Sequence, residues 1–275
     1  MDRSASLDRL VAEVLASPKY RSVSAEVVRR IGGRELAVRK SLKEAVKATH
    51  NKLHQAGGVY FEKRPGYAAD LALLAETAGT PDVLRAACRS IMSQHASTHE
   101  RLPILDRFFA ETLAGLGPIH LVIDVGCGLN PLAIPWMPLA EDAHYLALDM
   151  YGDLIDFLNQ AFPILHIDGR AETCDILGEL PAEPADLALM LKIIPCLEQV
   201  DKAAGERLLN GINARHMLVS FPIRSLSGYH KGMAQNYEAH FLTLVEGRPW
   251  SVQCFEFPNE LAFLVSKGDA DARPG

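Results

Sequence analysis

The chain has 275 residues, of which 48% are hydrophobic and 23% are charged, and its formal net charge is −6. This composition is typical of a folded globular protein and excludes a wholly disordered, collagen-like or coiled-coil chain. No apolar run reaches the roughly 18 residues of a membrane span, and five scattered cysteines without a secretory signal favour a cytoplasmic protein with no membrane partner.

The first hundred residues predict helices. Ser6 and Ser24 are candidate N-caps, and Gly32-Gly33 is expected to close the second helix because glycine readily adopts the left-handed conformation found after helices. Thr80-Pro81 is a cap followed by a proline at the first helical position. The expected helices cover residues 6–15, 24–31, 35–54 and 80–94.

Charge is distributed unevenly along the chain. Residues 1–64 hold 14 basic and 7 acidic residues, whereas residues 65–275 hold 14 basic and 27 acidic residues. A basic front segment is typical of a module that binds a polyanion, but a solvated helix surface gives the same pattern. Charge alone therefore leaves both interpretations open.

After residue 98, short β-rich runs alternate with helical stretches. This alternation predicts an α/β fold, a Rossmann-like parallel sheet with helices on both faces. The last run follows no clear helix, so we expect it to be an antiparallel edge hairpin. The expected strands cover residues 120–124, 144–149, 186–191, 216–221 and 261–265, with helices near 152–161 and 202–212. The predicted division is a helical domain (1–96), a Rossmann-like domain (97–268) and a disordered tail (269–275).

A glycine-containing turn follows the first strand, in the segment Asp124-Val-Gly-Cys-Gly-Leu-Asn-Pro131. Gly126 and Gly128 permit positive φ and a close approach of the backbone to a ligand. The third glycine of a dinucleotide-binding loop is replaced by Pro131, and Asp124 would repel a phosphate. The turn therefore favours a cationic ligand without phosphate, such as S-adenosylmethionine.

Two further acids follow in the order that such a cofactor needs. Asp149 ends the second strand, where a carboxylate can accept both ribose hydroxyls, and Asp175 is placed to accept the adenine amine. A turn with capping aspartates is the structural alternative. The order of the glycine turn and the two acids favours a methyltransferase.

Several strings closely resemble those of the aminoglycoside-resistance 16S ribosomal RNA (guanine-N7) methyltransferases of the Arm/Rmt type, over about residues 7–267. Each string is weak alone, but their joint order is specific. They are Tyr20, Val28-Arg-Arg30, Leu53-His54, His95-Ala-Ser-Thr-His-Glu-Arg101, Asp124 to Pro131, Leu191-Lys-Ile-Ile-Pro-Cys-Leu-Glu198, Ser220-Phe-Pro-Ile-Arg-Ser-Leu226, Lys231-Gly-Met-Ala-Gln-Asn-Tyr237 and Asn259-Glu-Leu261.

The resemblance implies a 16S rRNA (guanine(1405)-N(7))-methyltransferase that uses S-adenosylmethionine. It implies a helical RNA-docking domain, a Rossmann-like methyltransferase domain, and action on the decoding-site helix within the assembled 30S subunit. It also implies resistance to 4,6-disubstituted 2-deoxystreptamine aminoglycosides. The expected partner is thus 16S rRNA rather than DNA, and the expected state is a monomer.

The resemblance also implies roles for individual residues. Arg101 would pair with the cofactor carboxylate, although spacing alone favours a surface ion pair of Arg101 with Glu100 or Asp106. Lys192 and Glu198 would lie at the rim facing the RNA as the candidate catalytic residues, and Lys192 is expected to point into the cleft rather than to be a satisfied buried lysine. No metal site is expected, and the histidines, His95 among them, read as capping or surface residues. The cofactor-binding set is Arg101, Asp124, Gly126, Gly128, Asn130, Asp149 and Asp175.

Basic and aromatic side chains would contact the RNA. Phosphate contacts position a protein without reading sequence, and Tyr237 is a candidate for stacking on the target base, whereas Phe221 and Trp136 read as core residues. The family carries an arginine where Tyr229 stands here, so Arg224, Lys231 or Tyr229 would replace that contact. The candidate RNA-binding set is Lys19, Arg29, Arg30, Lys40, Lys43, Lys47, Arg224, Lys231 and Tyr237.

The chemistry of guanine N7 agrees with the residues present. N7 carries a lone pair and no proton, so its methylation needs orientation and water exclusion rather than a general base. The sequence offers no nucleophile paired with a base. The alternatives are a methyltransferase for another rRNA atom, such as adenine N1, or for a small molecule, and a non-catalytic ribosome-binding factor on the same fold.

Overall fold

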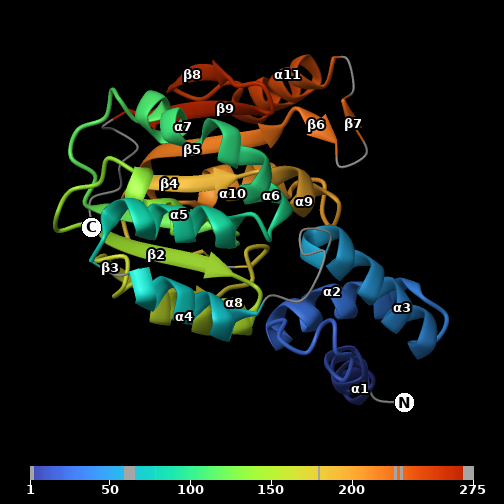
Figure 1. Ribbon diagram of the computed structural model, residues 1–275. Coiled ribbons are helices and arrows are strands. Elements are labelled where there is room, and N and C mark those ends of the chain that lie inside the picture. Colours follow the sequence, from blue (N-terminus) through green and yellow to red (C-terminus); the bar gives the residue numbers. More distant parts are fainter. Residues whose placement is uncertain are drawn as a thin grey trace.

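The helical front of the chain forms a unit with its own small core. The computed structural model describes residues 3–58, 66–77, 79–178, 180–225, 228–229 and 232–268. The unit lies at one side of the sheet (Figure 1) and packs Leu10, Val28 and Leu53 at its centre, all fully buried. Its elements are α1 (Arg3–Leu15), α2 (Ala25–Val38), α3 (Leu42–Leu53) and the π-helix η1 (His54–Gly58).

The expected end of α2 at Gly32-Gly33 is wrong, because the helix continues to Val38. Gly32 is instead the point where α1 approaches α2: a Cβ there would lie 2.2 Å from Leu10 Cδ2. The expected helix over residues 35–54 begins only at Leu42. Its start is set by Ser41, whose side chain accepts the Glu44 N–H (3.3 Å), while the Glu44 carboxylate accepts the Lys40 N–H (3.2 Å).

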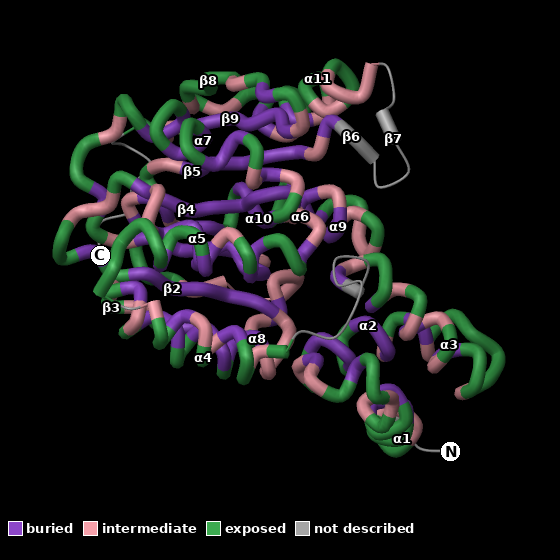
Figure 2. The backbone as a smooth tube through the Cα atoms, viewed as in Figure 1, coloured by how far each residue is buried: buried purple, intermediate pink, exposed green. Residues whose placement is uncertain are grey.

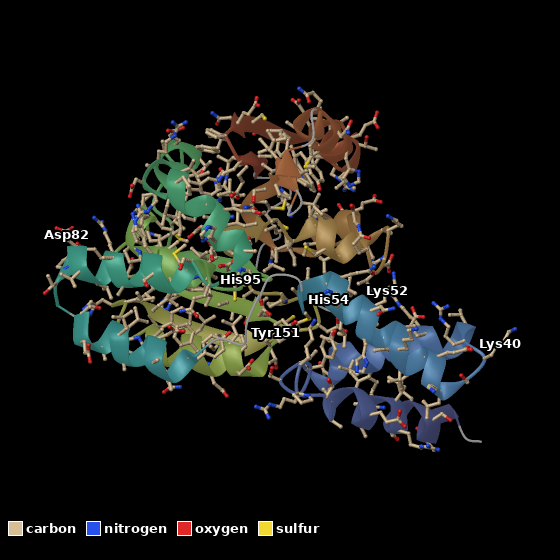
Figure 3. The ribbon with its side chains drawn as sticks, turned by 45° about the vertical axis from the view of Figure 1, so that its right-hand side comes forward. Lys40, Lys52, His54, Asp82, His95 and Tyr151 are labelled. Carbon is tan, nitrogen blue, oxygen red and sulfur yellow. The ribbon has the colours of Figure 1, made fainter. Side chains whose placement is uncertain are left out.

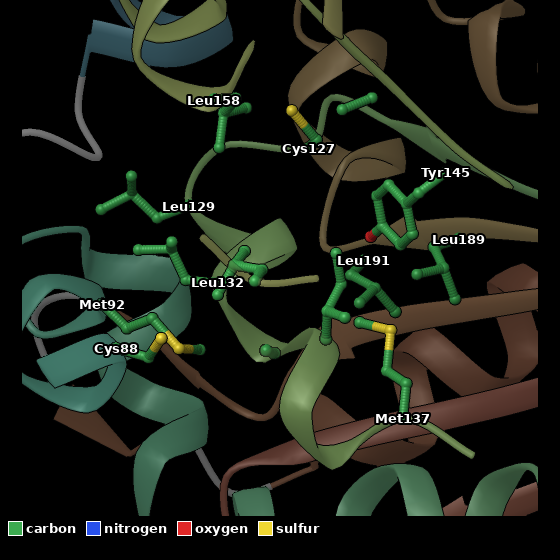
Figure 4. Close-up of a cluster of buried hydrophobic side chains, with 14 of the residues drawn as sticks. Cys88, Met92, Cys127, Leu129, Leu132, Met137, Tyr145, Leu158, Leu189 and Leu191 are labelled. Carbon is green, nitrogen blue, oxygen red and sulfur yellow. The ribbon is translucent and has the colours of Figure 1, made fainter. Parts of the chain in front are cut away.

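The next helices belong to the core of the sheet. They are α4 (Tyr67–Thr77), α5 (Pro81–Met92), α6 (Ala96–Arg101), the 3₁₀ helix η2 (Leu102–Ile104) and α7 (Leu105–Thr112). Figure 4 shows Cys88 and Met92 of α5 in the same buried cluster as Leu189 of the sheet. Along the described chain, the core of the helical unit therefore ends at Leu53 and the core of the sheet begins at Leu74. The domain boundary after residue 96 stays a prediction.

The central sheet has seven strands in the order β3-β2-β1-β4-β5-β9-β8, as Figure 1 shows. The strands from β3 to β5 are parallel, whereas β9 is antiparallel to β5 and β8 is antiparallel to β9. The predicted Rossmann-like α/β fold preceded by helices is thus confirmed. The strands are β1 (Leu121–Val125), β2 (His144–Asp149), β3 (Asp168–Thr173), β4 (Ala185–Leu191), β5 (Ala214–Pro222), β8 (Trp250–Glu256) and β9 (Glu260–Lys267).

Two of these strands, β3 and β8, were not expected, because most of their side chains are exposed or half-buried and give no apolar run. The last expected strand is antiparallel, as predicted, but β9 is interior and β8 forms the edge. Both expected helices between strands are present, as α8 (Gly152–Ala161) and α10 (Ala204–Gly211). The other elements are the 3₁₀ helix η3 (Asn130–Trp136), α9 (Ile194–Glu198), α11 (Met233–Val245) and the short hairpin β6 (Arg224–Ser225) with β7 (Gly228–Tyr229).

Helices cover both faces of the sheet. In β4, Leu187 and Leu189 pack with α5, α7 and α8, while Ala188 and Met190 pack with α9, α10 and α11. The central strands are accordingly buried along their length, as Figure 2 shows. This arrangement leaves the carboxyl edge of the parallel strands, beside the helical unit, as the place for a ligand.

Neither a membrane span nor a metal cluster is found in the described segments. No helix among them is long and apolar enough to cross a membrane. No group of three or more His, Cys, Asp or Glu side chains among them is arranged to hold a metal ion. The expected tail, residues 269–275, lies outside the described residues.

Candidate functional site

The turn after β1 depends on glycine at two positions. Gly126 has φ +66° and Gly128 has φ +50°. A Cβ on Gly126 would lie 2.6 Å from Ile193 Cδ1, and one on Gly128 would lie 3.0 Å from Cε1 of the His95 ring. Both the backbone conformation and the close packing therefore exclude larger side chains here.

The buried side chain of Asp124 stabilises this turn through hydrogen bonds. Its Oδ2 accepts hydrogen bonds from the Tyr145 hydroxyl (2.6 Å) and from Asn130 Nδ2 (2.8 Å). Burial raises the pKa of Asp124 to about 6, although both hydrogen bonds favour the charged form. Among the described residues neither Asp124 nor Asn130 lines the cavity defined below, so their expected contact with the cofactor stays a prediction. Their hydrogen bond orients the turn.

The raised pKa of Asp124 predicts a pH-dependent stability. A carboxyl whose pKa is raised in the folded state stabilises the fold below its unfolded pKa, and this contribution is lost as pH rises through about 6. The Asp124→Asn variant has no titrating carboxyl at this position, so its stability lacks this pH-dependent contribution. We expect urea unfolding to show the variant improving relative to the parent by about 1–2 kcal/mol between pH 5 and pH 8. A difference that stays constant with pH would refute this assignment.

Arg101 lies at the centre of a buried charged cluster. Its Nη2 is 2.6 Å from Glu260 Oε1, both side chains are fully buried, and Nη1 donates to Asn130 Oδ1 at 3.0 Å. The surface ion pair with Glu100 or Asp106 is therefore wrong. Glu260 was given no role from the sequence, although it stands in the Asn259-Glu-Leu261 string. Arg101 does not line the cavity in the described residues, so its contact with a cofactor carboxylate stays a prediction.

Lys192 joins the same cluster from the end of β4. Its φ is +61°, and its Nζ lies 2.7 Å from Glu100 Oε2, 3.3 Å from Glu260 Oε2 and 3.1 Å from the Ser97 carbonyl oxygen. The residue lines the cavity, but its ammonium is buried and has three acceptors. The less favoured interpretation, a satisfied buried lysine, therefore describes its side chain.

A cavity opens to solvent at the carboxyl edge of the sheet, and the empty space in and in front of it amounts to about 790 Å³. Asp149 and Asp175, the two acids expected at the ribose and the adenine, both line it, together with Gly126 and Gly128. Figure 3 shows His95 and Tyr151, two further lining residues, on the side of the sheet that faces the helical unit. The structure thus brings the glycine turn and both acids to one cavity.

The two acids are held in place by backbone groups. Asp149 Oδ2 accepts the Gly128 N–H (3.0 Å) and Oδ1 accepts the Met150 N–H (2.7 Å). Burial raises the pKa of Asp149, while these hydrogen bonds oppose the rise. Asp175 Oδ1 accepts the Leu177 N–H at 3.2 Å, and Oδ2 accepts from Arg30 Nε.

His95 is a lining residue that the sequence placed wrongly. It occupies the N-cap position of α6, but its ring is buried against Gly128 and makes no capping hydrogen bond from its side chain. Burial, with Lys192 and Arg101 nearby, lowers the pKa of His95 to about 3. The ring is therefore neutral at physiological pH. In the sequence, only its position in the string from His95 to Arg101, which carries the family resemblance, indicated that His95 could belong to the site.

Glu198 and Tyr237 are not among the described residues that line the cavity. Glu198 pairs with His240 across 2.9 Å, and Tyr237 stacks on the buried Phe221 ring at 5.0 Å between centroids. The core interpretation of Phe221 is confirmed, whereas Trp136 is only partly buried. The side chain of Arg224, together with Lys231 and the side chain of Tyr229, lies outside the described residues.

The basic residues of the helical unit differ in their partners. Lys19 Nζ lies 3.0 Å from His54 Nδ1, and Arg29 pairs with Asp8 at 2.7 Å on an exposed surface. Three lysines have exposed side chains with no ionic partner in the described part of the chain, and Figure 3 shows one of them, Lys40, at the outer end of the unit. They are Lys40, Lys43 and Lys47.

Comparison with known proteins gives consistent matches. The family described as "Ribosomal RNA methyltransferase (FmrO)" matches residues 16–264. A 16S rRNA (guanine(1405)-N(7))-methyltransferase of Frankia casuarinae is 39% identical over 267 residues, 95% of this chain and 94% of that protein. One of the same name from Serratia marcescens is 36% identical over 86% of this chain and 88% of its own.

Solved structures agree. The structure of the 16S rRNA methyltransferase RmtF in complex with S-adenosyl-L-homocysteine has a TM-score of 0.81 and 32% identity, and the match covers 97% of this chain and 99% of that one. The 16S rRNA methylase RmtB has a TM-score of 0.79 and 29% identity, over 95% of this chain and 98% of its own.

Proposed function

The chain belongs to the FmrO family of ribosomal RNA methyltransferases, and from this membership we propose that it methylates N7 of guanine 1405 in 16S rRNA with S-adenosylmethionine as the methyl donor. The observation that carries the proposal is the family match over residues 16–264, which covers the helical unit from α2 onward and all residues that line the cavity. Two curated proteins named 16S rRNA (guanine(1405)-N(7))-methyltransferase match over 267 and 265 residues, 95% of this chain in each case.

The cavity suits this cofactor. Its acidic side chains, Asp149 and Asp175, can accept hydrogen bonds from ribose hydroxyls and from an adenine amine. The one basic side chain among the described lining residues, Lys192, has its ammonium engaged by Glu100 and Glu260, so no free cation is provided for a phosphate. The neutral His95 ring and the glycine turn would bound the methionine end.

When bound, S-adenosylmethionine supplies an electrophilic methyl group on a positively charged sulfur. The protein does not have to remove a proton from guanine N7, which already carries a lone pair. Its residues act by orientation and by exclusion of water. Asp149 fixes the turn through the Gly128 N–H, and the apolar side chains of Ile176, Leu177 and Leu197 would exclude water from the cavity around the bound cofactor.

We infer that Lys192 and Glu198 serve this reaction from the carboxyl end of β4. Lys192 fastens α6, through Glu100 and the Ser97 carbonyl, beside the glycine turn. Glu198, paired with His240, joins α9 to α11 on the side of the sheet that would face the RNA. Both are therefore proposed as positioning residues.

The RNA-docking surface is proposed to be the exposed lysines of α3 and the turn before it. Lys40, Lys43 and Lys47 are free to neutralise phosphates, which would place the enzyme on the 30S subunit in the cytoplasm. We propose that it acts as a monomer. Methylation at guanine 1405 would remove the N7 acceptor and add positive charge where 4,6-disubstituted 2-deoxystreptamines bind, which gives the proposed resistance.

This docking mode predicts a dependence on the folded subunit. Because phosphate contacts carry no sequence information, selection of one guanine requires the shape of the assembled 30S particle. We expect transfer of labelled methyl groups to purified 30S subunits and weak or no transfer to a naked decoding-site hairpin. Efficient methylation of the hairpin would contradict the proposal. Cells that express the chain should resist gentamicin-type drugs and remain sensitive to apramycin, whereas adenine-N1 methylation would give apramycin resistance.

A further inference from the structure

We propose that the helical unit, α1 to η1, is part of the cofactor site, and that Arg30 is a positioning residue for Asp175 rather than a contact for ribosomal phosphate. This inference rests on the proposed function, because it takes the cavity at the carboxyl edge of the sheet to be the S-adenosylmethionine site. It changes the role expected for Arg30 and gives the helical unit a second task besides docking.

The helical unit builds one wall of the cavity. Val27 and Ile31, four residues apart on α2, share a face of that helix and line the cavity together with Asp149 and Asp175. Ala56 and Gly57 of η1 continue the wall. Without these residues Asp149 and Asp175, which are expected to bind the ribose and the adenine, would lie at an open edge of the sheet.

The wall approaches the sheet closely at Gly57. A Cβ on Gly57 would lie 2.3 Å from Met150 Cε and 3.2 Å from Tyr151 Cε2. Met150 and Tyr151, which directly follow Asp149, also pack against the small core of the helical unit. The segment that carries the ribose acid is therefore in direct contact with the unit.

Polar contacts fasten the wall at one edge to the segment after β2. The Ser24 N–H donates to the Met150 carbonyl oxygen (2.8 Å), and the Gly152 N–H donates to the Ser22 carbonyl oxygen (2.7 Å). Val23 and Tyr151 form an antiparallel bridge between these two bonds. Such backbone pairing fixes the register of the two segments.

A second set of contacts fastens the unit to the segment after α9. Arg34 Nη1 lies 3.1 Å from Asp201 Oδ2, and Lys52 Nζ donates to the Gln199 carbonyl oxygen at 2.5 Å. Val200 packs between them against the core of the unit. Both contacted segments contribute to the cavity lining, through Tyr151 and Val200.

Arg30 connects this wall of the cavity to Asp175, the carboxylate expected at the adenine amine. Its Nε donates to Asp175 Oδ2, and Asp175 is 9% exposed. The guanidinium rests on Gly178, where a Cβ would lie 2.6 Å from Nη2, so the absence of a side chain at Gly178 leaves room for it. The neighbouring Arg29 instead pairs with the exposed Asp8. The two adjacent arginines are similarly exposed, at 49% and 40%, but only Arg30 contacts a residue that lines the cavity, Asp175.

The arrangement leaves Asp175 able to serve a ligand. A carboxylate has about four acceptor positions, of which Arg30 and the Leu177 N–H occupy two. Arg30 keeps the carboxylate oriented, and the adenine amine would take a remaining position.

The test compares two adjacent arginines. Arg30→Gln, Arg30→Lys and Arg29→Gln would be measured by calorimetry with S-adenosylmethionine on the full-length protein, and by binding to 30S subunits without cofactor. We expect Arg30→Gln to raise the cofactor dissociation constant about tenfold or more, which is the effect of losing one charge-assisted contact. Arg30→Lys should restore part of the affinity, and Arg29→Gln should stay within about twofold of the parent.

A further variant tests the wall without touching Asp175. Arg34→Gln loosens the contact to Asp201 and should weaken cofactor binding several-fold, with thermal unfolding confirming that each variant is folded. The proposal is overturned if Arg30→Gln leaves the cofactor affinity unchanged, or lowers 30S affinity alone. A parent protein that binds S-adenosylmethionine but transfers no methyl group to 30S subunits would contradict the proposed function. The affinities of the variants for S-adenosylmethionine would then still decide whether the helical unit is part of the cofactor site.

Discussion

Arg101→Ala is expected to lower the free energy of unfolding by about 3–5 kcal/mol, because it leaves a buried carboxylate without its main partner. Glu260 is fully buried, and Arg101 contacts both of its oxygens, at 2.6–3.2 Å. The remaining cation, Lys192 at 3.3 Å, is shared with Glu100. Had Arg101 lain at the surface, as its spacing suggested, the substitution would have spared the fold.

The measurement is urea unfolding of Arg101→Ala beside Arg107→Ala. Arg107 forms an exposed pair with Glu111 four residues away at 2.9 Å, so its loss should cost less than about 0.5 kcal/mol. Equal stability of the two variants would show that the buried cluster is wrongly placed. Binding of S-adenosylmethionine, measured where the Arg101→Ala protein is still folded, then tests separately whether Arg101 also serves the cofactor.

The pH dependence provides a second reading of this cluster. Burial raises the pKa of Glu260, but Arg101 and Lys192 lower it more, so the folded-state pKa lies below its ordinary value. A carboxyl with a lowered pKa stabilises the fold above its unfolded pKa of about 4.3, and the contribution is lost as pH falls through the folded value. Arg101→Ala should therefore destabilise the protein more at pH 7 than below pH 4.

Reversal of the charges at Lys40, Lys43 and Lys47 is expected to weaken 30S binding by roughly tenfold or more and to leave cofactor binding unchanged. Each phosphate contact contributes a little under one unit to the slope of log K against log salt, so the triple variant should reduce that slope by about 3. The three side chains are exposed and lie away from the cavity, so the fold should not change.

The matched experiment titrates 30S subunits with the parent and the Lys40/Lys43/Lys47→Glu variant at several salt concentrations. Cofactor affinity is measured in parallel by calorimetry. If the variant keeps both the affinity for 30S subunits and the salt slope, the basic face of α3 is only a solvated surface. In that case the charge asymmetry of the sequence has no functional meaning.

The sequence predicted those parts of the fold in which local pattern and packing agree. The expected strands at 144–149 and 186–191 are strands in the structure because their apolar runs are buried on both faces. The end of α2 was misplaced, because Gly32 serves a close helix contact with Leu10 that no local pattern reveals. Strand β8 was missed because, as an edge strand, it has mostly exposed side chains.

The same distinction applies to the site. The glycine turn, Asp149 and Asp175 could be predicted, because each follows a strand at the edge where ligands bind. The partners of Arg101 and Arg30 could not, because Glu260 is 159 residues away and Asp175 is 145 residues away along the chain. Long-range ion pairs leave no spacing in the sequence, so the burial of Lys192 and the wall formed by α2 appear only in the structure.

The central claim is that the chain methylates N7 of one guanine of 16S rRNA. Borohydride–aniline treatment cleaves RNA at 7-methylguanine, and primer extension then reports the position. After incubation of 30S subunits with the protein and S-adenosylmethionine, the account predicts a single new stop that corresponds to guanine 1405. A methylated particle with no cleavage, or with cleavage at another guanine, would contradict it.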